Sequence, residues 1–407
     1  MNKKFLISII VLITVVLSFF MLKTPQKDNN DVVLWTLQMG DFAPYMNKVI
    51  SNFEKENPTI KIKWIDVPFS EGEKRTLASI LSDNPPDLIN LNPDFTNLLA
   101  QRGALYEINT PEIAQYNQEI VNSLKYNGKL YSLPWYATSA ITIYNKSLVK
   151  KAGVSLPKTY EDIATISPQI KSKTGAYAQL PNITENDTMV KILNKYGVNS
   201  SDKINSPESI AVFDFYKNLY AKDLIPKETV TQTQREALEK YMAEKIVFFQ
   251  AGANFLNMIK ENAPSTYKNT DVAPQITGKL GQNDFSLMNF IIPQRAKHKS
   301  AALKFALYLT NAQNQLELAK LTNVIATNNK SLQDDFYTKY EPDDLMAKAR
   351  VISAKQLNKI NPVLRPDRNQ KEVNTIINSA VQEILLGKTP TKKALGRVAK
   401  DWKSLGN

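Results

Sequence analysis

The chain of 407 residues contains no cysteine and only one histidine. The lack of cysteine excludes disulfide bonds, thiol catalysis and cysteine-ligated metal sites. It also excludes a lipid-bearing cysteine behind an export signal, an anchor that many exported proteins have. The single histidine, His298, stands in the charged stretch Ala296-Lys297-His298-Lys299, which is typical of a solvated turn. These surroundings argue against a histidine-based metal site and against a Ser-His-Asp triad.

A block of consecutive basic residues is also missing, although the net charge is +12. Lysine and arginine are scattered among acidic residues, and no basic run is interleaved with aromatics, so nothing favours nucleic-acid binding. The composition, 43% hydrophobic and 22% charged, is that of a folded globular protein rather than a disordered one. In an exported protein, a basic surface favours the membrane face or an anionic ligand.

The longest apolar run lies at the start of the chain. Lys3 and Lys4 precede the uncharged residues 5–22, and Lys23 follows them. A charge followed by an apolar run is how an export signal begins. As a helix the run would span about 27 Å, close to the ~30 Å of a bilayer's hydrocarbon, and it lacks small residues at a cleavage spacing. A cleaved signal and an uncleaved anchor are both open, and the length favours the anchor.

Residues 24–30 form a polar tether, and about 375 residues follow it, enough for two domains of ordinary size. The spacing of apolar residues predicts a strand at 32–35, a helix at 45–56 and a strand at 60–64. A second unit has a helix ending near 81, a strand at 88–91 and a helix starting at Asp94. This order is the parallel unit of an α/β sheet.

Further along, Asn127-Gly128 predicts a two-residue hairpin, and residues 140–144 a strand. Residues 302–321 are expected to form one long helix. An apolar stripe predicts another helix that ends at Gly387, and a last helix follows it.

Several stretches of the chain resemble the extracellular solute-binding proteins of ABC sugar importers, of the maltose-binding type. Each motif is weak alone, but their order and spacing together are specific, and they cover nearly the whole chain after the tether. The stretches are VLWT at 33–36, FEKENPTIKI at 53–62, PDLI at 86–89, GAL at 103–105, NGKLYSLP at 127–134, IYNKSL at 143–148, AGV at 152–154, PKTYED at 157–162, and residues 301–320.

The resemblance implies an α/β fold of the two-lobe, type II periplasmic-binding-protein class, in which each lobe is a sheet flanked by helices. Ligand would lie in the cleft between the lobes, and closure would present the protein to the membrane permease. The resemblance divides the chain into a signal or anchor with tether at 1–30, an N-lobe at 31–137 plus 288–335, and a C-lobe at 138–287 plus 336–407. It places the hinge crossings near 134–140 and 285–289.

A sugar site needs aromatic rings that stack on the pyranose and planar polar groups that bond its hydroxyls. The resemblance places a sugar-contacting carboxylate at Asp94, for which a role as helix N-cap is equally open. Phe95 follows where the family often has a polar residue, so this wall of the cleft is expected to be more apolar. Leu91 stands where the maltose binder has a tryptophan, so maltose held in that same way is not expected.

Trp135 and Tyr136 follow the predicted hinge proline and favour a stacking platform, with hinge packing as the alternative. In the first loop, Trp35, Gln38 and Phe42 occupy the equivalent of the family's first binding segment, although Trp35 also fits the core of its strand.

In the second lobe, Gly252, Asn254 and Phe255 follow the apolar run 246–249 and match the family's strand-to-helix loop. Gly252 would allow close approach of the backbone to a ligand. Asn289 at the second crossing and Asn328 are further candidates.

Arg365 and Arg368 lie in the loop before the penultimate helix, where the family often places ligand contacts. A guanidinium can fork two hydroxyls or a phosphate, although a pair of solvated surface charges is the alternative.

The leading hypothesis is therefore a substrate-binding subunit of an ABC importer, which captures a sugar or oligosaccharide outside the cytoplasmic membrane. An anionic solute, such as a phosphorylated polyol or acidic sugar, is the first alternative. An exported glycoside hydrolase is the second, but Asp94 has no obvious carboxylate partner in the sequence. We expect no enzyme activity, cofactor, metal or nucleic acid. The expected partners of a monomer are a carbohydrate or polyol and the permease, with residues 5–22 as membrane tether.

Overall fold

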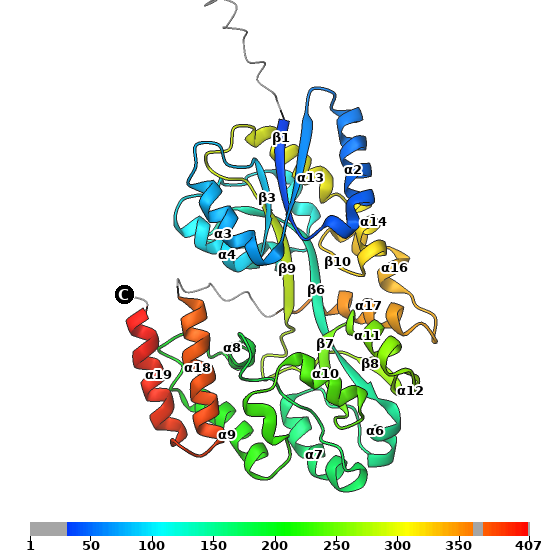
Figure 1. The fold of residues 1–407 in the computed structure, drawn as a ribbon, viewed down its shortest axis with the longest axis vertical. Helices are drawn as coiled ribbons and strands as arrows, with labels where there is room; N and C mark the ends of the chain where they lie inside the picture. The colour runs from blue at the N-terminus through cyan, green and yellow to red at the C-terminus, as the bar shows by residue number, and fades with distance from the viewer. Residues whose placement is uncertain (1–30, 361–368, 406–407) are drawn as a thin grey trace, which may run out of the picture.

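The computed structural model describes residues 31–360 and 369–405, which fold into two lobes arranged along the long axis of the molecule (Figure 1). Two strands, β6 (Ser132–Asn145) and β9 (Phe285–Ile291), run side by side from one lobe to the other. The predicted class, an α/β fold of two lobes, is confirmed. The predicted signal or anchor lies outside the described residues, and no helix within them is long and apolar enough to cross a membrane.

The N-lobe is built on a sheet in which strands far apart in the sequence are neighbours. Its order is β10-β6-β9-β3-β1-β2, with β1 at Asp31–Leu37, β2 at Lys61–Val67, β3 at Leu88–Leu91 and β10 at Ile325–Ala326. β1 pairs in parallel with both β2 and β3, which confirms the predicted strand-helix-strand units. β3 is buried along its whole length, as expected for an inner strand of a sheet covered on both faces.

The helices of this lobe come from both ends of the chain. They are α2 (Ala43–Glu56), α3 (Phe69–Ile80), α4 (Pro93–Gln101), α5 (Gln118–Ser123), α13 (Lys299–Leu309), α14 (Ala312–Thr322), α15 (Asn329–Leu332) and α16 (Asp335–Thr338), with 3-10 turns η1 (Gly40–Phe42) and η2 (Pro111–Gln115). The predicted hairpin is formed by β4 (Lys125–Tyr126) and β5 (Lys129–Leu130). Asn127 and Gly128 both have positive φ there, at 50° and 79°, as a type I′ turn requires.

The C-lobe surrounds the second half of β6. This half pairs with β7 (Phe248–Gly252) and β8 (Thr270–Ala273) instead of β9, so one strand belongs to the sheets of both lobes. The other elements are α6 (Lys146–Ala152), α7 (Tyr160–Thr174), α8 (Thr188–Asn194), α9 (Pro207–Ala221), η3 (Lys227–Val230), α10 (Gln234–Met242), α11 (Phe255–Asn262), α12 (Pro264–Lys268), α17 (Leu345–Gln356), α18 (Gln370–Leu385) and α19 (Thr391–Leu405).

Helix α17 provides a third connection between the lobes. Its residue Ala349 is fully buried in a C-lobe cluster with Ile143 and Val272, whereas Leu357, just after the helix, joins the N-lobe core. The C-terminal helices pack on the C-lobe through the predicted stripe, which includes the fully buried Val373 and Ile377. Within the described part of the chain, three segments therefore connect the lobes.

Two predictions about helix boundaries were wrong. The expected single helix at 302–321 is two helices, because Asn311 adopts an extended backbone and its side chain caps α14 by accepting a hydrogen bond from the backbone of Asn314. Asp94 is not the N-cap of α4. That role belongs to Asn92, whose Oδ1 accepts the Phe95 N–H at 2.8 Å, and Pro93 occupies the first helical position.

The segment around His298 is not simply a solvated turn. The carboxylate of Asp87, which is only 3% exposed, accepts backbone N–H groups from Val33 at 3.0 Å and from His298 at 2.9 Å. The His298 ring nitrogen Nδ1 lies 3.3 Å from the same carboxylate. Through Asp87, His298 thus connects the start of α13 to the N-lobe sheet by hydrogen bonds.

Candidate ligand-binding site

A cavity of about 370 Å³ lies on the C-lobe, where this lobe meets the two hinge strands. Its wall mixes aromatic rings with amide and charged side chains, the combination that a polyhydroxylated ligand needs. The aromatic residues in the wall are Tyr160, Tyr216, Phe248, Phe249, Phe255 and Phe285. The amides and charges are Gln179, Asn182, Gln234, Gln250, Asn254, Lys191 and Asp284.

The loop between β7 and α11 contributes three of the predicted residues. Gly252, Asn254 and Phe255 all line the cavity. A Cβ atom on Gly252 would lie 2.6 Å from Asn254 Oδ1, so the absence of a side chain makes room for the Asn254 amide. Phe255 packs edge-to-face on Phe249, with ring centroids 5.5 Å apart. The structure therefore brings these three predicted residues together at one site.

A second loop of the wall, residues 179–183, was missed by the sequence reasoning. Gln179 is 6% exposed, and among the described residues neither its Nε2 nor the buried Tyr216 hydroxyl has a hydrogen-bond partner. Buried donors of this kind are normally satisfied by a ligand or water. The loop reaches the cavity because Tyr177 pairs with Ile246 beside β7, a long-range contact that leaves no local signal in the sequence.

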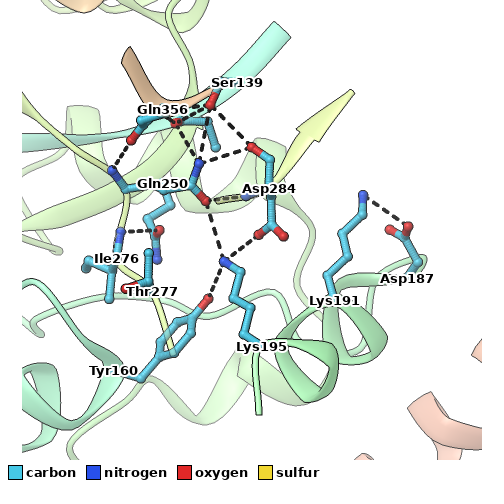
Figure 2. A network of polar contacts seen from close by, with 12 residues as sticks. Ser139, Tyr160, Asp187, Lys191, Lys195, Gln250, Ile276, Thr277, Asp284 and Gln356 are labelled. Carbon is cyan, nitrogen blue, oxygen red and sulfur yellow. Dashed lines mark hydrogen bonds and ion pairs between the residues drawn. The ribbon is translucent and has the colours of Figure 1, made fainter. Parts of the chain in front are cut away.

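Charged groups of the C-lobe act on a carboxylate of the N-lobe. Lys191 on α8 forms an ion pair of 3.0 Å with Asp187, the residue that precedes this helix (Figure 2). Both belong to the C-lobe, yet both act electrostatically on Asp94, which lies on α4 of the N-lobe. Asp94 therefore lies within electrostatic range of the C-lobe, although it is not part of the cavity wall.

This position changes the ionisation of Asp94. The Asp94 side chain is exposed to solvent, yet many protein atoms lie around its carboxylate, and the resulting desolvation raises its pKa to about 6. The negative charges of Asp187 and Glu73 add to the rise of the pKa, and the Lys191 ammonium opposes it.

In the first loop, Gln38 has a left-handed backbone with φ of 54° and its side chain is exposed. It borders a shallow hollow on the N-lobe together with Asp41 and Asp66. Phe42 is half-buried against the N-lobe core, and Trp35 is half-buried beside a second core cluster. Of these predicted residues, Gln38 presents the most accessible polar group.

The predicted stacking platform at the hinge needs correction. Trp135 is fully buried, with its ring 4.5 Å from that of Phe290, because the β6–β9 register shifts between Pro134 and Tyr136. Such a bulge turns the extra residue away from the regular alternation of the strand. The hinge-packing alternative therefore describes Trp135, and Tyr136 beside it remains partly accessible.

Other predicted contacts are also covered by protein. Phe95 is 7% exposed and belongs to a core cluster, and Asn289 is fully buried with its amide donating to the Thr96 hydroxyl at 2.9 Å. Asn328 is buried and bonds Gln115. Neither Phe95 nor Asn289 offers a surface to a ligand in this conformation. Arg365 and Arg368 lie outside the described residues.

The chain belongs to the bacterial extracellular solute-binding protein family, whose sequence profile matches residues 48–342. It is 27% identical over 316 residues to the multiple sugar-binding protein of Streptococcus mutans, a match covering 70% of this chain and 73% of that one. Its fold is similar to that of a candidate oligosaccharide periplasmic-binding protein from Synechococcus sp. MITs9220, with a TM-score of 0.81, 26% identity, and coverage of 92% and 98%.

The sugar-binding protein MalE from Xanthomonas citri shares the fold as well, with a TM-score of 0.77, 20% identity, and coverage of 92% of this chain and 97% of that one. The predicted family and the two-lobe binding-protein fold are thus confirmed. The family and these relatives are binding proteins rather than enzymes, and the family is extracellular.

Proposed function

We propose that this protein is the substrate-binding subunit of an ABC importer. It captures a sugar or oligosaccharide outside the cytoplasmic membrane and delivers it to the permease when the lobes close. The observation that carries this proposal is the cavity beside the hinge, whose wall combines aromatic rings with amide groups from separate loops. The similarity to a multiple sugar-binding protein supports the same ligand class.

The charge of the cleft favours a neutral ligand over an anion. Among the described residues, the cavity wall contains one charge of each sign, Lys191 and Asp284. Lys191 is already in an ion pair with Asp187, and Asp284 with Lys195, so a phosphate or carboxylate would have to compete with carboxylates that are in place. The two arginines that motivated an anionic solute lie outside the described residues. On the charges of the described wall we propose a neutral polyhydroxylated ligand.

We also propose that the protein works as a monomer without enzyme activity. It meets two permease subunits at the membrane surface. Residues 5–22 hold it there if they are not cleaved. Mass spectrometry of the N-terminus of the mature protein distinguishes an anchor from a cleaved signal, because cleavage would remove this segment.

Thermal unfolding of the full-length protein tests the ligand class. The protein is kept in a detergent without a sugar headgroup and screened against neutral oligosaccharides, polyols and phosphorylated or acidic sugars. A ligand that binds only the folded state at 100 times its Kd stabilises it by about 2.7 kcal/mol, so a neutral sugar should raise Tm with concentration and with little salt dependence. No shift with any carbohydrate, or turnover of a glycoside, would contradict the proposal.

Two variants test whether the ligand raises Tm by binding in this cavity. Asn254→Ala removes an amide from the cavity wall, whereas Asn257→Ala changes an exposed asparagine one turn further along α11. The first variant should lose most of the ligand-dependent rise in Tm, and the second should keep it.

A further inference from the structure

A lysine with no solvent exposure lies directly behind the cavity wall. Lys195, just after α8, is 0% exposed, and its Nζ lies 2.6 Å from Oδ2 of Asp284. The same ammonium donates to the Tyr160 hydroxyl at 3.3 Å (Figure 2). It also donates to Oε1 of Gln275 at 3.5 Å. A cation without solvent needs such partners, because desolvation without compensation is very costly.

Its carboxylate partner differs from it in exposure. The side chain of Asp284 is 26% exposed and lines the cavity, while that of Lys195 is 1% exposed. The ion pair is therefore one-sided: the cation is enclosed by protein and the anion faces the space where a ligand would lie. An ion pair that served only the core would enclose both groups.

The backbone of Asp284 is fixed at the hinge. Its N–H donates to Gln275 Oε1 at 2.8 Å, and its carbonyl accepts from Gln275 Nε2 at 3.0 Å. The backbone N–H of Gln275 donates to Gln356 Oε1 at 2.7 Å, and the Gln356 amide donates to the Ser139 hydroxyl at 2.9 Å. Ser139 belongs to β6, Asp284 precedes β9 and Gln356 ends α17.

The three described segments that connect the lobes therefore meet around one buried amide network (Figure 2). Within this network Ser139 and Asp284 line the cavity, and Asp284 is the member that carries a charge. We propose that Asp284 is a ligand-contacting carboxylate that accepts hydroxyl groups of a neutral carbohydrate, and that Lys195 is the positioning residue that holds it. This inference rests on the proposed function and deepens it. Occupancy of the cavity then acts directly on a residue of the hinge.

Isothermal titration calorimetry on the full-length protein tests the role of Asp284, with maltotriose, raffinose, sucrose and cellobiose as the probes. Asp284→Asn keeps the shape of the side chain but removes its charge. A hydrogen bond to a charged group corresponds to about a 10- to 100-fold change in Kd, so Asp284→Asn should weaken binding of the bound probe by about that factor. Because this change leaves the Lys195 ammonium unpaired, the double variant Lys195→Met/Asp284→Asn is measured beside it.

The chain offers a matched control ion pair. Lys348 and Asp271 are also 2.6 Å apart in the C-lobe, with side chains 24% and 22% exposed, but neither lines the cavity. Asp271→Asn and Lys348→Met/Asp271→Asn should leave Kd within about 2-fold of the unmodified protein, the usual limit of effects between distant sites. Binding within that range by the Asp284 double variant overturns the inference.

The failure of the inference differs from that of the proposed function. If the unmodified protein binds a probe and the Asp284 variants bind it equally well, only the inference falls. If the unmodified protein binds none of the probes, the proposed function falls and takes the inference with it. Both results are read from the same titrations.

The positioning role of Lys195 has its own readout. Lys195→Met should weaken binding of the same probe. When Lys195→Met is already present, adding Asp284→Asn should raise Kd by a factor about 5-fold or more smaller than it does in the unmodified protein. A lysine that merely supports the core would lower Tm without this coupling in Kd. Additive effects of the two substitutions on Kd would overturn the role.

Discussion

The carboxylate of Asp66, at the end of β2, accepts a hydrogen bond of 2.7 Å from the Thr36 hydroxyl at the end of β1. It also accepts the backbone N–H groups of Met39 at 2.9 Å and Gly40 at 2.8 Å. One side chain thus ties the loop that contains the ligand candidate Gln38 to the neighbouring strand.

From this geometry we expect Asp66→Ala to lower the free energy of unfolding by about 2 kcal/mol, because hydrogen bonds to a partly buried charged group are lost. Asp41→Ala, which changes an exposed carboxylate of the same loop, should have little effect. Urea denaturation measures both. Equal effects of the two substitutions would show that Asp66 does not fix the loop.

The burial of Trp135 gives a second prediction. Its ring is fully buried in the N-lobe core and contacts Phe290, so Trp135→Ala should lower the free energy of unfolding by about 3–5 kcal/mol through loss of packing and creation of a cavity. Trp135→Phe should cost less, because most of the aromatic contact is kept. A loss in ligand affinity without any loss in stability would instead indicate the stacking role.

The parts of the fold that local chemistry controls were predictable from the sequence. The strand at 88–91 follows from four consecutive apolar or amide residues between turn signals, and the 127–128 hairpin from the positive φ that Asn and Gly tolerate. The break at Asn311 was not predictable from apolar spacing, because an Asn cap competes with a periodicity that continues through it.

The site was predictable only where a single loop contains it. Gly252, Asn254 and Phe255 follow a buried strand, so their place at the cavity could be inferred from local order. Lys195 and Asp284 meet only in the folded chain, and a lysine just after a helix normally suggests a solvated charge. Trp135 was misplaced because a bulge, which the sequence does not reveal, alters the direction of its side chain.

The raised pKa of Asp94 makes a prediction about pH. Because the pKa rises from 3.8 to about 6 on folding, the folded state binds more protons than the unfolded state between these values. The contribution of Asp94 to the free energy of unfolding is therefore greatest below about pH 4 and declines as pH rises to about 6. Because the Asp94 side chain is exposed, solvent screening limits the change in the free energy of unfolding to about 1 kcal/mol.

Asp94→Asn should remove this part of the pH dependence and stabilise the protein slightly at pH 7. Denaturation at pH 4.5, 5.5 and 7 measures it, with Asp83→Asn, at a fully exposed carboxylate, as the control. If the free energy of unfolding of Asp94→Asn depends on pH as that of the unmodified protein does, the pKa of Asp94 is not raised by folding.

Two glycines near the cavity should respond differently to the same substitution. At Gly252 an added Cβ would meet only the Asn254 amide, the movable end of a side chain, at 2.6 Å. At Gly278 it would meet Lys195 Cβ at 2.9 Å, the Lys195 carbonyl oxygen at 3.1 Å and the Tyr196 ring at 2.8 Å. Gly252→Ala can be accommodated by rotation of Asn254, whereas Gly278→Ala requires a shift of the backbone.

We therefore expect Gly278→Ala to lower the free energy of unfolding by about 1–3 kcal/mol, the usual cost of overpacking, and Gly252→Ala by less than about 1 kcal/mol. Gly252→Ala should instead weaken ligand binding, because it displaces the Asn254 amide from the cavity wall. Adding Asn254→Ala to it should then cause little further loss of affinity, since both changes remove the same contact. Full additivity of the two effects on Kd would indicate that Gly252 acts through its own backbone instead.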